Sequence, residues 1–274
     1  MNHENKMRKI LDSGKGSVAT RIYSRWPVTV EALASTGKYD YVQFLGEYAP
    51  FDQYFLEDFA RVTELTGLGS MIKLDYMNRA YVAQKSLASG IESILFADHR
   101  TVEDVEETLK FVTPECPQYG NGQLGFAFRR WRGYWGLSPQ LDFAQMASES
   151  VKAFMVEKQS FVDAIDEICS IKGVDMLQYG PCDYAMSNGY NVKDEPQKIK
   201  ETELKIFKAA DKYGVAVCAE LMDCSDKDQI KYYLDLGVKH FNVGMELLAM
   251  EDFWKREGSV LLEEMDKAGV EVQK

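Results

Sequence analysis

Two acidic residues stand where they could hold a metal ion. Glu157 ends one short apolar run, and Asp183 follows the next run after the sharp Gly180-Pro181 turn. Two carboxylates from adjacent strand ends, completed by water, form a site that a hard cation such as Mg²⁺ or Mn²⁺ accepts. The alternative is that each carboxylate is merely solvated or caps a helix, and the spacing alone does not exclude it.

These residues belong to a repeated pattern of a short apolar run followed by a helical stretch. The expected strands are Ser17–Tyr23, Tyr39–Leu45, Ser70–Leu74, Ile91–Ala97, Ala153–Glu157, Val174–Tyr179, Val215–Leu221 and Lys239–Met245. The expected helices include Trp26–Ser35, Phe55–Thr66, Arg79–Ala88, Val102–Val112, Phe161–Ile171, Pro196–Tyr213 and Asp226–Leu236. Such alternation favours a parallel sheet, and eight units in 274 residues predict one closed (β/α)₈ TIM barrel over residues 1–274.

In such a barrel, chemistry lies at the carboxyl ends of the strands. Those ends offer Glu47 and Tyr48, Lys73, Asp98 and His99, Glu157, Gly180 to Asp183, Glu220 and Glu246.

Two segments depart from the repeat. Residues 114–150 form a long excursion with Arg129, Arg130 and Arg132 among aromatic residues. It either brings arginines to the catalytic strand ends, where they bind a second anionic group, or packs against a neighbouring subunit. Residues 246–274 add an amphipathic helix after the last strand.

Composition narrows the classes of function. The chain has 43 acidic and 32 basic residues, a net charge of −11 that disfavours nucleic acid and anionic membrane surfaces as partners. No apolar stretch approaches the length of about 20 residues that spans a bilayer, and no export signal is seen. The five cysteines contain no C-x-x-C pair. A cytoplasmic protein with reduced thiols is therefore expected. Three histidines are too few for a histidine-rich zinc site.

The chain resembles the HpcH/HpaI aldolases of the phosphoenolpyruvate/pyruvate barrel superfamily, from Gly14 to Trp254. The resemblance is carried by the order and spacing of several motifs: Tyr39-Asp40-Tyr41 with Gly46-Glu47-Tyr48-Ala49-Pro50, Gly90-Ile91-Glu92-Ser93, Gly173-Val174-Asp175 through Gly180-Pro181-Cys182-Asp183, and Leu236-Gly237 through Val243-Gly244.

The resemblance implies a pyruvate-type ligand that chelates a divalent cation, Mg²⁺, Mn²⁺ or Co²⁺. Glu157 and Asp183 match the family's two metal ligands, and the backbone amides of Cys182 and Asp183 match those that hold the ligand carboxylate. The metal then serves as a Lewis acid for an enolate. The resemblance also implies a homo-oligomer, a hexamer or trimer, with an exchanged carboxy-terminal helix.

The departures from the family pattern fall on the chemistry. Tyr48 stands where the family has a histidine base, Leu45 where it has that histidine's acidic partner, Lys73 where it has an arginine, and Ala88 where it has an acid. Tyrosine is a poor base at neutral pH but a good donor to an oxyanion. Lys73 keeps the positive charge and loses the planar fork.

Another base could replace the histidine. His99, just after the fourth strand, and metal-bound water are the candidates, although His99 could also be solvent-exposed or a cap. His240, at the entry end of the last strand, is expected to be structural.

We therefore expect a metal-dependent carbon–carbon lyase of the aldolase type that acts on a 2-oxo acid or sugar acid, with an aldehyde as partner. The alternative is a descendant that binds such an acid without aldol turnover, as a sensor or a pathway-assembly protein.

Overall fold

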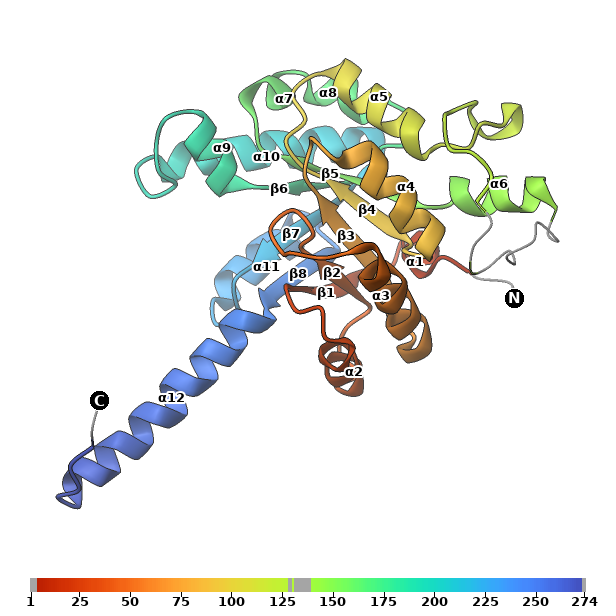
Figure 1. The fold of residues 1–274 in the computed structure, drawn as a ribbon. Helices are drawn as coiled ribbons and strands as arrows, with labels where there is room; N and C mark the ends of the chain where they lie inside the picture. Colours follow the sequence, from red (N-terminus) through yellow and green to blue (C-terminus); the bar gives the residue numbers. More distant parts are fainter. Residues whose placement is uncertain (1–3, 128–129, 131–138, 273–274) are drawn as a thin grey trace.

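The computed structural model describes residues 4–127, 130 and 139–272, and its centre is a closed barrel of eight parallel strands in the order β1 to β8 (Figure 1). The strands are β1 (Ser17–Ile22), β2 (Tyr41–Phe44), β3 (Gly69–Leu74), β4 (Ser93–Phe96), β5 (Val151–Val156), β6 (Met176–Tyr179), β7 (Ala216–Leu221) and β8 (His240–Met245). Pairing of Ser17 with His240 closes the ring between β1 and β8. The predicted (β/α)₈ barrel is confirmed.

Helices surround the barrel and connect its strands. They are α1 (Lys6–Asp12), α2 (Pro27–Ser35), α3 (Gln53–Thr66), α4 (Arg79–Ser89), α5 (Val102–Val112), the 3₁₀ turn η1 (Pro117–Tyr119), α6 (Gln140–Ser148), α7 (Gln159–Asp163), α8 (Ile165–Ser170), α9 (Pro181–Ser187), α10 (Pro196–Tyr213), α11 (Lys227–Asp235) and α12 (Glu246–Lys267). The predicted helix Phe161–Ile171 is wrong in extent, because the chain breaks at Ala164 into α7 and α8. No helix of the described residues is long and apolar enough to cross a membrane.

An apolar layer fills the amino-terminal half of the barrel. Tyr41, Met71, Met176 and Cys218 point inward there and are almost fully buried. Met7 of α1, with no exposed surface, packs into the same cluster from below. The barrel is therefore sealed at its amino end.

The described residues of the 114–150 excursion lie at that sealed end. The excursion follows α5 and precedes β5, so it connects the end of a helix to the start of a strand. Arg130 forms an ion pair with Glu64 in the last turn of α3, just before β3 begins. The hypothesis that Arg130 lies beside the catalytic strand ends is therefore wrong, while Arg129 and Arg132 lie outside the described residues.

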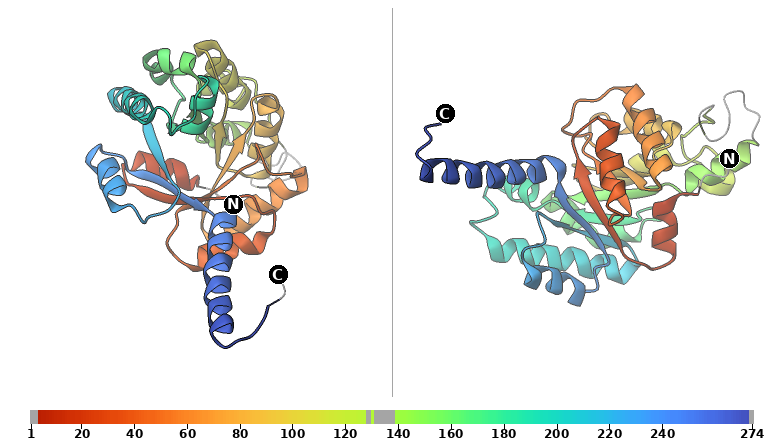
Figure 2. Two further views of the ribbon diagram at one scale, coloured as in Figure 1. Left: turned by 90° about the vertical axis from the view of Figure 1, so that its left-hand side faces the viewer. Right: turned by 90° about the horizontal axis from the view of Figure 1, so that it is seen from below.

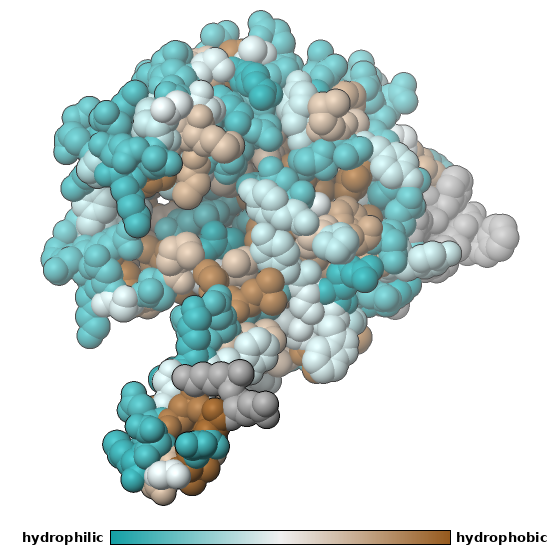
Figure 3. Space-filling view, turned by 60° about the vertical axis from the view of Figure 1, so that its left-hand side comes forward, coloured by the Kyte–Doolittle hydropathy of each residue, from teal (hydrophilic) through white to brown (hydrophobic). Residues whose placement is uncertain are grey.

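Helix α12 projects away from the barrel as a long arm (Figure 2). None of its residues is buried, and apolar side chains are largely exposed along it, namely Leu247, Met250, Phe253, Trp254, Val260 and Leu261. Figure 3 shows hydrophobic side chains on the surface of this arm. Exposed apolar area of this extent usually marks an interaction surface.

Candidate active site

A cleft of about 880 Å³ opens at the carboxyl ends of the strands. It is hollowed into the face seen in Figure 3. Polar residues line it from several strands, namely Arg21, Gln43, Tyr48, Lys73, Asp183 and Glu220. The turn from Gly180 to Asp183, which links β6 to α9, forms another part of its wall.

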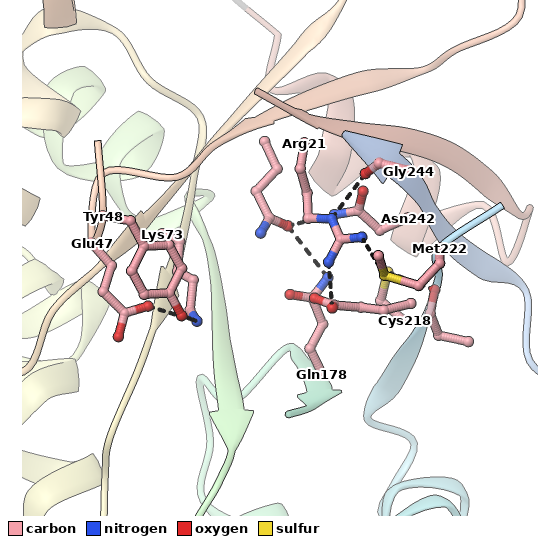
Figure 4. A network of polar contacts seen from close by, with 12 residues as sticks. Arg21, Glu47, Tyr48, Lys73, Gln178, Cys218, Met222, Asn242 and Gly244 are labelled. Carbon is pink, nitrogen blue, oxygen red and sulfur yellow. Dashed lines mark hydrogen bonds and ion pairs between the residues drawn. The ribbon is translucent and has the colours of Figure 1, made fainter. Parts of the chain in front are cut away.

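Lys73 is the centre of the charged cluster in this cleft. Its side chain is only 5% exposed, and its Nζ lies 2.6 Å from Glu47 Oε2 and 3.4 Å from Glu157 Oε1. Nζ also donates a hydrogen bond of 2.9 Å to Tyr48 Oη. Strands β2, β3 and β5 thereby bring together three of the predicted site residues, Tyr48, Lys73 and Glu157 (Figure 4, left, for the first two).

Opposing effects set the protonation of this cluster. Burial alone would lower the pKa of Lys73, but the carboxylates of Glu157 and Glu47 raise that pKa above its usual range. Partial burial raises the pKa of Tyr48 above its usual value, against the opposing effect of the Lys73 charge. At neutral pH the pair is therefore an ammonium and a protonated phenol, so Tyr48 can donate a proton and is not a base.

Glu157 is the most buried acid of the site, 1% exposed. Its Oε2 accepts a 2.9 Å hydrogen bond from the backbone N–H of Asp98. Burial raises its pKa, which the charge of Lys73 opposes. A Cβ on Gly180 would lie 2.7 Å from Glu157 Cγ and 3.0 Å from Oε1, so the glycine leaves the space that this carboxylate needs.

Asp183 stands in the first turn of α9 and faces the same cleft. Its charge also contributes to the raised pKa of Glu157, after the larger effect of burial. Among the described residues, no group of three or more histidine, cysteine or acidic side chains is arranged to hold a metal ion. A cation at this position would therefore rest on two carboxylates and complete its shell with water or ligand oxygens.

A second polar group lines the opposite side of the cleft, and sequence analysis missed most of it. Arg21 Nη1 contacts Glu220 Oε2 at 2.7 Å, and Arg21 Nε donates to the Gly244 carbonyl at 2.9 Å (Figure 4). The amides of Gln43, Gln178 and Asn242 lie fully buried in the barrel. The alternation of side chains along a strand could have placed them, because residues two apart point to the same side. Gln43 and Gln178 stand two residues after inward-facing residues of the apolar layer, and Asn242 pairs with Glu220 on the neighbouring strand.

His99 is not part of the cleft. It has no exposed surface, its Nδ1 lies 2.9 Å from the Ala97 carbonyl, and its Nε2 lies 2.7 Å from Thr108 Oγ1. The carbonyl requires Nδ1 to carry the hydrogen, so Nε2 accepts from the threonine. Both nitrogens are thus occupied within the wall, and the hypothesis that His99 replaces the missing base is wrong. His240 binds Ser17 Oγ at the barrel entry and is structural, as predicted.

Comparisons with known proteins place these features in context. The sequence profile of HpcH/HpaI aldolase/citrate lyase matches residues 34–251. The chain is 23% identical to the hydroxypyruvate/pyruvate aldolase of Agrobacterium fabrum over 250 residues, 89% of this chain and 88% of that protein.

Solved structures share the fold. An HpcH/HpaI aldolase from Desulfitobacterium hafniense DCB-2 superimposes with a TM-score of 0.80 at 21% identity, covering 94% of this chain and 97% of that one. Citrate synthase SbnG has a TM-score of 0.78 at 22% identity, covering 97% and 100%.

The close approach of Gly180 to Glu157 yields a first prediction. Gly180→Ala forces the Glu157 carboxylate to move, because the added methyl group overlaps its side chain. We expect a loss of about 1–3 kcal/mol in the free energy of unfolding, measured by chemical denaturation. Gly125→Ala is the control, since a Cβ there meets nothing within 4 Å. Equal stability of the two variants would contradict this tight contact.

Burial of His99 yields a second prediction. Burial lowers its pKa from 6.5 to about 4, opposed by the nearby Ala97 carbonyl. The unfolded chain thus takes up the proton first, so the stability contributed by neutral His99 is complete above about pH 6.5 and falls as the pH drops towards 4. His99→Asn should remove up to about 3 kcal/mol of this pH dependence, measured by denaturation at several pH values. An unchanged slope would contradict the buried, neutral state.

Proposed function

Because the chain belongs to the HpcH/HpaI aldolase/citrate lyase family, we propose that it is a metal-dependent carbon–carbon lyase that cleaves or forms the bond next to a 2-oxo acid. One observation carries the proposal: the Lys73 ammonium, held by Glu47 and Glu157, faces the same cleft as Asp183 and the Gly180–Asp183 turn. With a divalent cation also held there, this positive charge offsets the nearby carboxylates and suits a site for a small anionic keto acid.

The residues present fit a divalent cation. Beside Glu157 Oε1, Gly180 leaves a space that a Cβ would fill, and Asp183 in the cleft adds a second hard oxygen donor. These two side chains would hold the ion, Mg²⁺, Mn²⁺ or Co²⁺. When bound, the ion supplies Lewis-acid stabilisation of the enolate form of the 2-oxo acid.

The chain's own groups then bind the substrate and hold a proton. The Lys73 ammonium attracts the substrate's negative charge, and the Cys182 and Asp183 amides hold its carboxylate, as the family likeness suggests. Tyr48 keeps its proton at Oη and points it at the oxygen where charge develops.

The proton balance follows from this arrangement. In the bond-forming direction, the methyl carbon of the 2-oxo acid passes a proton to a water molecule and attacks the aldehyde carbon, and the aldehyde oxygen takes up one proton. Tyr48 supplies that second proton and recovers one from solvent. Cleavage runs through the same steps in reverse.

A second candidate is binding of a 2-oxo acid or sugar acid without aldol turnover, as a sensor or pathway-assembly protein. Two observations favour it. No histidine is found among the described residues that line the cleft, and the pKa of Tyr48 is raised. It shares the same ligand cluster and differs only in the missing proton acceptor.

The cytoplasmic location remains a prediction.

Proton exchange at pyruvate separates these candidates. In deuterated water with Mg²⁺, Mn²⁺ or Co²⁺, the wild-type protein should exchange the methyl protons of pyruvate, as followed by proton NMR. Lys73→Met should lower this exchange rate at least about 100-fold, because the positive charge that faces the substrate anion is lost. Lys73→Arg keeps the charge and should retain part of the rate.

Three further measurements complete this test. Glu157→Gln with Asp183→Asn should abolish metal binding in calorimetry. Tyr48→Phe should slow aldol formation more than exchange, since only bond formation needs the phenol proton. Pyruvate binding without exchange under every metal would instead support the second candidate.

We also propose that α12 joins copies of this chain into a homo-oligomer. Trp254 and Leu261 are 62% and 63% exposed and lie seven residues apart, on one face of a helix that touches little of its own barrel. An apolar stripe this long suits the surface of a second copy, with which α12 could be exchanged.

The double substitution Trp254→Glu and Leu261→Glu should release monomers of 31.2 kDa in light scattering after gel filtration. Lys255→Glu is the control, because Lys255 lies beside the stripe and pairs only with Glu251 along the helix. A wild-type protein that is already monomeric would contradict the proposal.

A further inference from the structure

The inner wall of the cleft contains hydrogen-bonding groups that the reaction does not use. Gln43 Oε1 accepts hydrogen bonds from Asn242 Nδ2 at 2.8 Å and from Gln178 Nε2 at 3.3 Å. All three side chains have no exposed surface. Figure 4 shows Gln178 and Asn242 beneath and beside Arg21.

Three atoms of this amide cluster, Gln43, Gln178 and Asn242, remain without a partner. They are Gln43 Nε2, a donor, and Gln178 Oε1 and Asn242 Oδ1, both acceptors. A buried polar atom left unpaired costs about 1–3 kcal/mol. Of these three residues only Gln43 lines the cleft, so a molecule bound in the cleft meets the cluster at Gln43.

The strand pattern shows that the cluster is built into the barrel. Gln43 and Gln178 stand two residues after Tyr41 and Met176, which belong to the apolar layer, and Asn242 lies on β8 beside Glu220 of β7. The barrel interior thus changes from apolar to polar within one step along these strands. Apolar side chains at these positions would continue the core, so the amides require another explanation.

Charge decides which ligand fits. Arg21, the cation next to the amide cluster, is already neutralised by Glu220 at 2.7 Å, and its Nε is used by the Gly244 carbonyl. The net charge on this side is therefore close to zero, which does not favour a second carboxylate or phosphate. One free donor and two free acceptors match hydroxyl groups, because each hydroxyl both donates and accepts.

We propose that the amide cluster is a subsite for the hydroxyl groups of a polyhydroxylated aldehyde or of the sugar acid formed from it. The inference rests on the proposed function, since it names the partner that the 2-oxo acid meets in the same cleft. In this arrangement the 2-oxo acid lies by Lys73 and Glu157, and the hydroxylated part lies toward Gln43. Figure 4 shows Arg21 and Gln178 across from Lys73.

The test compares two acceptors of equal length and one acceptor that carries a charge. Aldol formation from pyruvate is measured with glyceraldehyde, which has two hydroxyls, with propanal, which has none, and with glyoxylate, which carries a second carboxylate. Because a hydroxyl also activates the neighbouring carbonyl, the decisive quantity is the ratio of kcat/KM for glyceraldehyde to that for propanal, compared between proteins.

Gln43→Glu is the informative variant. It keeps the oxygen that accepts from Gln178 and Asn242 and replaces only the unpaired donor, and chemical denaturation of the variant checks that it is folded. We expect the ratio to fall at least about tenfold, because the hydroxyl oxygen that accepts from Gln43 Nε2 loses its donor. Gln197→Glu, on the exposed side of α10, is the matched control and should keep the wild-type ratio. Asn242→Leu provides a second variant should Gln43→Glu be unstable.

The outcomes are distinguishable from failure of the proposed function. Pyruvate methyl exchange needs no aldehyde, so absence of exchange in the wild-type protein contradicts the lyase. The subsite is then tested by calorimetry with threonate and butyrate. The wild-type protein should bind threonate more tightly than butyrate. Intact exchange with an unchanged ratio in both variants would overturn the subsite and leave the amides to bound water. Preference for glyoxylate would also overturn it, by showing an anion site.

Discussion

The ammonium of Lys73 between two buried carboxylates is the constraint around which this site is organised. Glu157 and Glu47 reach it from different strands, so the ion pairs fix how β2, β3 and β5 present their ends. A buried charge with one partner removed is strongly unfavourable, and each member therefore depends on the others. Tyr48 stays protonated in this setting, which makes the site a holder of positive charge and of one proton.

Much of the barrel is readable from the sequence because its signals are local. Helix α10 begins at Pro196 and ends before Gly214, and Thr101 with Asp104 forms the expected capping box at α5. Glu157 and Asp183 were likewise placed by the ends of their strands. Short helices such as α9 follow the turns at strand ends. They contain too few apolar residues at helical spacing to be predicted from the sequence.

The errors have physical reasons that particular residues illustrate. Arg130 was associated with the catalytic end by composition, whereas chain order alone assigns a helix-to-strand connection to the opposite end. His99 follows a strand, but a positive φ of 62° at Asp98 accompanies a turn that leaves the imidazole inside the wall. Gln43 and Gln178 read as ordinary residues of apolar strands, because only closure of the barrel brings their amides together.

The sealing of the barrel by α1 has a consequence for the order of events. With Met7 in the apolar layer, molecules enter and leave through the mouth at the carboxyl ends alone. The component that sits deepest must then arrive first and depart last, as in a compulsory-order kinetic scheme. A non-reacting molecule bound at that mouth would consequently prevent release of the ligand bound deeper in the cleft.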